Sequence, residues 1–198
     1  MLDTITIRER ILTDDNFVLA EAQRILYIYT LKHTIRYGQA RKETDYTESV
    51  AEHIYGMHII TNYFAPLEFA HNTLNRDRVS VLITWHELGE IETGDIPNIR
   101  KTDADRKREA ALLPGIIEKL PTHMQAEVTA ILDEYEAQTT AESQFTKAID
   151  KIEPLIHSLH PLGKGTQQQL QLTGESSRAT KAPYVKKYPT IQRFSDVL

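Results

Sequence analysis

The sequence predicts an all-α fold built as a single domain. The chain has 198 residues, 40% of them hydrophobic, which is enough for one sizeable core and leaves little for a second. Along most of the chain, apolar residues return every three or four positions, which is the spacing of one helix face, and they rarely alternate as they would in a strand. No apolar run approaches the length of a membrane span.

The composition excludes several classes of site. The chain has no cysteine, which rules out disulfides, thiolate metal sites and a cysteine nucleophile, and which agrees with a reducing compartment. The formal net charge of -5 argues against a broad electrostatic grip on a nucleic acid polymer or an anionic membrane, but leaves room for a small anionic ligand in a local basic pocket. Residues 1–16 mix charged and apolar side chains, so we expect no signal peptide and a cytoplasmic protein.

The first part of the chain predicts two helices with a loop between them. Apolar residues recur at helical spacing over residues 16–31, where we expect the first helix. Residues 33–48 are mostly polar and contain a glycine, and they predict a loop. The second helix is expected to begin at Ser49, which is a favoured N-cap residue, and to end before Pro66.

The remaining helices are bounded by caps and helix breakers. They are expected from Asn75 to Gly94, over residues 103–113, from Pro121 to residue 138, and over residues 141–159. Pro114 and Gly115 are expected to stop the helix over residues 103–113. The helical domain is therefore expected to cover residues 1–163. Residues 164–198 are polar and weakly periodic, and predict an irregular segment packed on, or trailing, the same domain.

The helix expected to end at Gly94 has an unusually acidic end. Residues 83–97 read ITWHELGEIETGDIP, in which an apolar start runs into His86 and four carboxylates. His86 and Glu90 are one helical turn apart and are expected to share a face. The string HELGE invites comparison with the zinc protease pattern H-E-x-x-H, but Glu90 stands where that chemistry needs a second imidazole. This class of protease is therefore not supported.

Two further polar residues lie within apolar helical stretches. They are His53 in SVAEHIYGMHII and Asp150 in FTKAIDKIEPLI. Either one alone is more often a hydrogen-bonded core residue than a ligand. Together with His86 and Glu87, they form a set of two imidazoles and two carboxylates from three helices, which would suit one divalent transition metal ion.

These segments resemble the HD-domain phosphohydrolases, and within them the 5'-deoxynucleotidase subgroup. The family pattern of a histidine, a later His-Asp pair and a distant aspartate matches His53, His86 with Glu87, and Asp150. The segments LKHTIRYG, ESVAEH, GEIETGDIP and EYEAQTTAESQFTKAIDKIE are also similar, so the resemblance covers residues 31–159. Glu87 departs from the family, which has an aspartate there. Its extra methylene is expected to weaken or alter metal binding.

The resemblance implies an HD-type helical bundle that holds one divalent metal ion, of cobalt, manganese, magnesium, zinc or iron. It implies metal ligation by His53, His86, Glu87 and Asp150. It also implies a homodimer and a small-molecule nucleotide substrate, with neither nucleic acid polymer nor membrane as a partner.

The resemblance also assigns roles beside the metal. It implies that Glu90 and Asp95 assist the attacking water or the leaving group, and that Arg36 contacts the substrate phosphate. Gly94 would allow a tight turn that aims Asp95 at the site. Tyr37 stands near the position where the subgroup often has a tryptophan that shapes the substrate pocket, while Glu92 is expected to face solvent.

The predicted function is therefore a metal-dependent phosphohydrolase that acts on nucleotides through metal-activated water, with 5'-deoxynucleoside monophosphates as first substrates. The alternative is a nucleotide-binding or regulatory protein of the same fold that has lost turnover through Glu87. A purely structural helical protein ranks last.

Overall fold

The computed structural model describes residues 4–39, 47–69, 73–97, 100–160 and 173–198, which form helices joined by turns and loops. The α-helices are α1 (Thr4–Thr13), α2 (Asp15–Ile28), α3 (Val50–Glu68), α4 (Arg76–Trp85), α5 (Glu90–Thr93), α6 (Asp103–Glu118), α7 (Thr122–Ala137), α8 (Ala141–His157), α10 (Gly174–Val185) and α11 (Pro189–Val197). The described residues contain no strand, and the all-α prediction is confirmed. No helix in them is long and apolar enough to cross a membrane.

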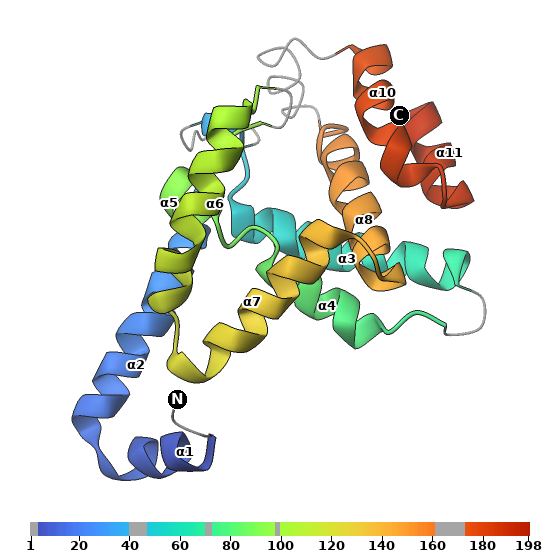
Figure 1. Cartoon of the computed structure of the whole chain (residues 1–198). Helices are drawn as coiled ribbons and strands as arrows, with labels where there is room; N and C mark the ends of the chain where they lie inside the picture. The colour runs from blue at the N-terminus through green and yellow to red at the C-terminus, as the bar shows by residue number, and fades with distance from the viewer. Residues whose placement is uncertain (1–3, 40–46, 70–72, 98–99, 161–172) are drawn as a thin grey trace.

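The main core is built around α8. This helix packs against α3, α4, α10 and α11 (Figure 1). Phe145, Ile149 and Ile152 lie on its buried side and are not exposed at all. A second apolar cluster joins α6 and α7 to the end of α2 through Leu88, and α1 and α2 extend away from the rest of the molecule (Figure 1). The first cluster holds α3 and α4 against α8. The second cluster holds the turn after α4 through Leu88.

Capping boxes begin α3 and α8, and the cap of α3, Ser49, is the one expected from the sequence. Ser49 accepts a hydrogen bond from the backbone of Glu52, and the Glu52 side chain returns one to the backbone of Ser49, so α3 begins with a capping box. Thr140 caps α8 in a similar way. These caps fix where α3 and α8 start.

Proline ends neither of the two helices where it was expected to. The expected end of α3 before Pro66 and the expected end of α6 at Pro114 are both wrong, because each helix continues for at least two residues beyond its proline. A proline within a helix removes one backbone hydrogen bond. In α6 the burial of Ile116, at 1% exposure, helps to offset that loss.

The helix expected to run to Gly94 is interrupted. It ends at Trp85, four turn residues follow, and α5 begins at Glu90. His86 is the C-cap of α4, and its backbone N–H still bonds to Leu82. His86 and Glu90 therefore do not share the face of one continuous helix.

The expectation of an irregular segment over residues 164–198 is wrong where the structure describes it. Residues 174–185 and 189–197 form α10 and α11, while residues 164–172 lie outside the described residues. Val185, Tyr188 and Ile191 are at most 3% exposed and belong to the main core cluster. Burying apolar side chains of this size contributes about 1.5–3 kcal/mol each. The two helices are thus packed on the same domain as α3 and α8.

Candidate metal centre and the cavity beside it

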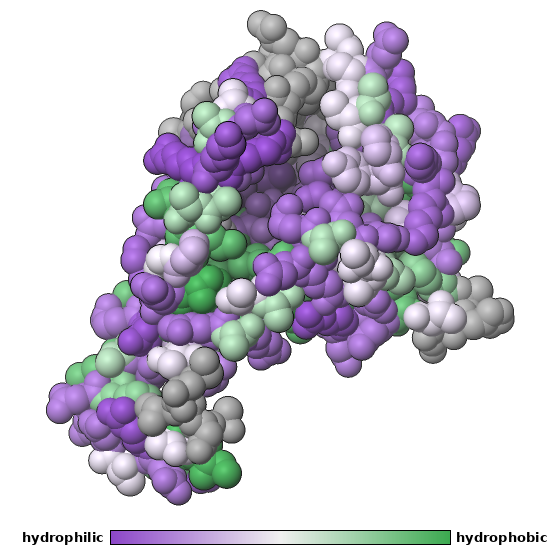
Figure 2. Space-filling view, in the orientation of Figure 1, coloured by the Kyte–Doolittle hydropathy of each residue, from purple (hydrophilic) through white to green (hydrophobic). Residues whose placement is uncertain are grey.

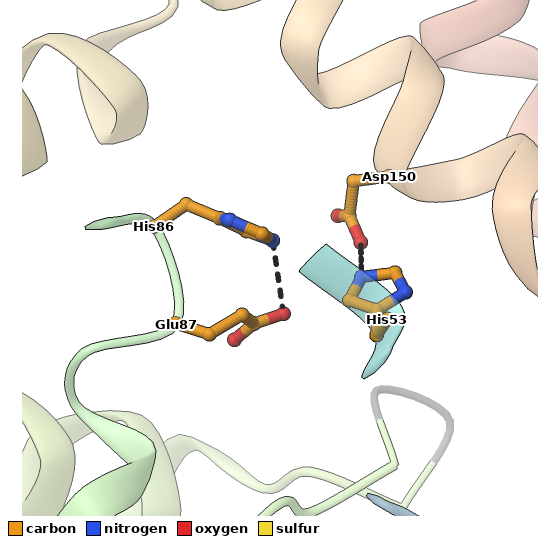
Figure 3. A group of neighbouring side chains, drawn as sticks. All are labelled: His53, His86, Glu87 and Asp150. Atoms are coloured by element: carbon orange, nitrogen blue, oxygen red, sulfur yellow. Dashed lines mark ion pairs between the residues drawn. The ribbon is translucent and has the colours of Figure 1, made fainter. Parts of the chain in front are cut away.

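Four side chains from three parts of the chain meet in the interior. Ligand-capable atoms of His53, His86, Glu87 and Asp150 all lie within 4.8 Å of one another. His53 comes from α3, His86 and Glu87 from the turn after α4, and Asp150 from α8 (Figure 3). The structure therefore brings together all four of the residues that the sequence proposes as metal ligands.

The backbone sets the orientation of the His86 ring. Its Nδ1 lies 2.8 Å from the carbonyl oxygen of Ile83. A carbonyl oxygen only accepts hydrogen bonds, so Nδ1 carries the proton and the lone pair is on Nε2. Figure 3 shows this ring turned toward the other three side chains. The contact to Ile83 thus directs Nε2 of His86 toward the group.

A buried carboxylate orients His53 in the same way. Its Nδ1 lies 2.7 Å from Oε2 of Glu153, three residues after Asp150 on α8. A carboxylate can only accept here, so this contact places the proton on Nδ1 and leaves Nε2 for the group. Carboxylates that hold a ligating imidazole in this manner are typical of metal sites. Glu153 was not identified from the sequence, although its spacing from Asp150 places both on one face of α8.

The two imidazole nitrogens that face the group have no hydrogen-bond partner among the described residues. They are Nε2 of His53 and Nε2 of His86, and both are fully buried atoms. The nearest carboxylate oxygens are 3.5 Å away, on Asp150, and 3.2 Å away, on Glu87. Leaving a buried polar group unpaired costs about 1–3 kcal/mol. Two unpaired imidazoles and two carboxylates are a donor set that fits one divalent metal ion.

Both carboxylates of the group favour the ionised form that a metal ligand needs. Burial alone would raise the pKa of Glu87, but the neighbouring His86 holds it well below its ordinary value. Burial likewise opposes the shift at Asp150, where the positive charge of Lys151 is the largest effect that holds the pKa well below its ordinary value. The extra methylene of Glu87 does not keep its carboxylate out of the group.

Glu90 and Asp95 lie close to this group. Glu90 is 8% exposed, and its Oε2 has no hydrogen-bond partner among the described residues. Burial, followed by the carboxylates of Glu87 and Asp95, raises the pKa of Glu90 well above its ordinary value. Gly94 has a φ of 67°, so the tight turn expected before Asp95 is present. Glu92 is exposed, as expected.

The backbone N–H of Tyr37 donates a hydrogen bond to the carboxylate of Asp95. Tyr37 has a φ of 63°, in the left-handed region that side chains other than glycine rarely adopt. Strained residues of this kind persist where the surrounding structure holds them, often at functional sites. Tyr37 thus fixes the position of Asp95 through its backbone, while its side chain lines the cavity described below.

Arg36 is buried in a network of ion pairs. Its Nη1 lies 2.7 Å from Glu48 and 3.4 Å from Glu153. It also lies 2.8 Å from Nδ1 of His53, but both of these nitrogens carry hydrogens, so the two groups share the Glu153 carboxylate and do not bond to each other. Glu48, Glu153 and His157 also have ligand-capable atoms within 4.8 Å of one another. The guanidinium of Arg36 already supplies a positive charge to the two carboxylates of this second group.

The comparisons with known proteins identify the family. The family model described as HD domain matches residues 28–192 of this chain. The chain belongs to the HD domain family.

Two curated relatives of this HD domain chain are the 5'-deoxynucleotidases HDDC2 of Xenopus laevis and Homo sapiens. The first is 33% identical over 132 residues, which are 65% of this chain and 63% of the relative. The second is 30% identical over 131 residues, which are 65% of this chain and 61% of the relative. The match thus spans less than two thirds of the length of either relative.

The fold has a counterpart among solved structures. A crystal structure described as a predicted metal-dependent phosphohydrolase, from Magnetospirillum magnetotacticum, has a TM-score of 0.69 and 24% sequence identity. The alignment covers 90% of this chain and 93% of that one. At this identity the likeness supports the HD-type helical fold.

A cavity of about 690 Å³ opens beside the four-residue group of the HD domain. This volume is in the range of sites for small molecules. Figure 2 shows the opening as a mostly hydrophilic recess between α6 and the helices α8 and α10. His86, Glu87, Asp150, Glu90, Asp95 and Arg36 line it, and so do residues of α10 that the sequence did not single out. His53 holds its ring behind this lining and is 0% exposed.

Proposed function

We propose that this HD domain chain is a metal-dependent phosphohydrolase that acts on 5'-deoxynucleoside monophosphates. The observation that carries the proposal is the pair of buried, unpaired imidazole nitrogens beside two carboxylates, at the wall of a cavity of about 690 Å³. The curated relatives named 5'-deoxynucleotidase support the substrate class. A cavity of this size has room for a nucleotide.

The proposed metal ligands are His53, His86, Glu87 and Asp150, which would hold one divalent ion of cobalt, manganese, magnesium, zinc or iron. Such an ion supplies Lewis acidity, which activates water and offsets phosphate charge. Glu153 and the Ile83 carbonyl hold the two imidazoles so that each directs Nε2 toward the ion. The protein thus contributes a rigid, buried donor set.

Glu90 and Asp95 are the proposed proton-transfer groups. In hydrolysis, water attacks phosphorus, the bond from phosphorus to the 5' oxygen breaks, the water loses a proton and the leaving oxygen gains one. Glu90 is buried beside Glu87, and Asp95 is held by the backbone of Tyr37. Both carboxylates line the cavity, where they can accept and return that proton.

Arg36 is the proposed contact to the substrate phosphate. It lines the cavity, and its ion pairs with Glu48 and Glu153 keep the guanidinium in one place. A fixed guanidinium suits the oxygens of a phosphate. Because Glu48 and Glu153 offset part of its charge, other cations of the cavity must contribute to phosphate binding.

We also propose that the chain forms a homodimer. The two N-terminal helices leave large apolar side chains exposed, including Leu12, Leu19 and Leu26 at 65%, 65% and 56%. Exposed large apolar side chains that gather in one part of a protein are typical of interfaces. Sedimentation velocity of the wild type and of a Leu19→Glu, Leu26→Glu variant tests this, because a dimer held by these helices should dissociate in the variant.

Phosphate release tests the proposed function. Metal-stripped protein is resupplied with cobalt, manganese, magnesium or zinc and assayed on a panel of nucleoside and deoxynucleoside mono- and triphosphates. We expect metal-dependent turnover of deoxynucleoside monophosphates, lost in His86→Ala and kept in the control His123→Ala, which alters an exposed histidine of α7. Metal binding without turnover of any substrate would refute the enzyme and favour a nucleotide-binding protein. A rate gain in Glu87→Asp would show that Glu87 weakens the site.

A further inference from the structure

One wall of the cavity carries a group of lysines that the proposed mechanism does not use. Lys147 and Lys151 lie one turn apart on α8, and Lys181 comes from α10. All three line the cavity, together with Ser177, which is 7% exposed and lies one turn before Lys181 on α10. We call these four residues the lysine wall. Through the lysine wall, α10 contributes side chains to the cavity beside the site.

Two lysines of the lysine wall form no ion pair among the described residues. Lys151 forms an ion pair with Asp150, at 2.7 Å. Among the described residues, Lys181 has no carboxylate within ion-pair distance, and its Nζ instead donates to the hydroxyl of Ser177, at 2.6 Å. The Nζ of Lys147 lies 4.2 Å from the ring centroid of Tyr135. Two of the three ammonium groups are therefore left with neutral partners.

Partial burial disfavours the charged form of these lysines when no anion is bound beside them. Burial, followed by the charge of Lys151, lowers the pKa of Lys181 to about 8. Burial likewise lowers the pKa of Lys147, although Asp150, Glu136 and Glu87 act in the opposite direction. Like charges that converge in a partly buried space repel one another, and a bound anion would relieve that repulsion. The cavity thus has one wall built to receive negative charge.

We propose that Lys181, with Ser177 and Lys147, forms an anion-binding subsite that takes the phosphate group of the substrate. The identification of the anion as a nucleotide phosphate rests on the proposed function. Two ammonium groups and a hydroxyl offer several donors to one ligand, which suits the multiple oxygens of a phosphate better than a single carboxylate. The contact from Lys151 to Asp150 places the lysine wall next to the proposed metal ligands.

Calorimetric titration with inorganic phosphate tests the subsite without turnover. The proteins are the wild type, Lys181→Gln, Lys181→Arg and the control Lys186→Gln, which alters the exposed lysine that caps the end of α10 outside the cavity lining. Loss of a charged donor should weaken phosphate binding about tenfold or more in Lys181→Gln. We expect partial recovery in Lys181→Arg and no change in Lys186→Gln. Phosphate binding that is absent, or equal in the wild type and Lys181→Gln, would overturn the proposal.

The same variants separate this proposal from the proposed function. If the chain hydrolyses nucleotides and Lys181 binds their phosphate, Lys181→Gln should raise KM about tenfold, with a smaller effect on kcat. If phosphate binding depends on Lys181 but no nucleotide is hydrolysed, the subsite stands and the proposed function fails. If turnover is found and Lys181→Gln leaves both KM and phosphate binding unchanged, the function stands and the subsite fails.

Discussion

Gly56→Ala is expected to disturb the metal centre from a position that touches none of the four proposed ligands. Gly56 lies on α3, one turn after His53. A Cβ added there would lie 2.8 Å from Oε1 of Glu153, which is closer than real Cβ atoms approach. The other oxygen of that carboxylate holds Nδ1 of His53. The alanine must therefore push the Glu153 carboxylate away from the imidazole that it orients.

Two opposing effects set the size of the change. Alanine is favoured over glycine inside a helix by about 0.5–1 kcal/mol. Loss of a hydrogen bond that involves a charged group costs about 1.5–3 kcal/mol. The free energy of unfolding should therefore fall by about 1–2 kcal/mol in the metal-free protein. Loss of such a support typically lowers metal affinity by about 10–100-fold.

Cobalt titration by calorimetry and thermal unfolding of the metal-free protein measure the two effects. Gly115→Ala is the matched control, because Gly115 lies within α6 and a Cβ there would meet nothing within 4 Å. It should raise the melting temperature and leave cobalt affinity unchanged. The reasoning is wrong if Gly56→Ala behaves like this control, with wild-type cobalt affinity and a raised melting temperature.

Three further predictions concern other parts of the structure. Gln138 has a φ of 48° at the end of α7, so Gln138→Gly should raise the free energy of unfolding in urea by about 0.5–1 kcal/mol, and a decrease would contradict this. Burial raises the pKa of Glu134, but the hydrogen bond from Thr140 and the ion pair with Arg78 outweigh it and hold that pKa below its ordinary 4.5. Glu134→Gln should therefore cost about 1 kcal/mol at pH 7, and that difference should vanish as the pH falls below 4.5; a difference independent of pH would refute the linkage. Tyr135→Phe removes the hydroxyl that donates to Asp150 at 3.1 Å, and should weaken cobalt binding by up to about tenfold; unchanged affinity would count against this role.

The proposed metal ligands could be predicted because local sequence carries their signal. His53 and Asp150 are polar residues in apolar helical stretches, and such residues need a partner in the interior. The same reasoning could not predict the ion pair between Arg36 and Glu48. The ion-pair network around Arg36 joins segments that only the tertiary fold brings together. Glu153 had a weak local signal, its three-residue spacing from Asp150.

The sequence of the C-terminal helices α10 and α11 shows why they were not predicted. Val185, Tyr188 and Ile191 recur every three residues, which is a helical signal, but Pro189 stands between them and the flanking residues are polar. Their burial depends on the surface that α3 and α8 present, which is not visible in the local sequence. The lysine wall therefore also escaped prediction, because Lys181 looks like an ordinary solvated lysine until α10 is placed beside α8.

The most direct test of the account measures bound metal and phosphate release in the same samples. Metal-stripped protein receives increasing amounts of cobalt, and each sample is analysed for cobalt per chain and for phosphate released from a deoxynucleoside monophosphate. The account predicts a rate that rises in proportion to bound cobalt and levels off at about one ion per chain. Turnover by stripped protein, or one bound ion with no turnover, would contradict it.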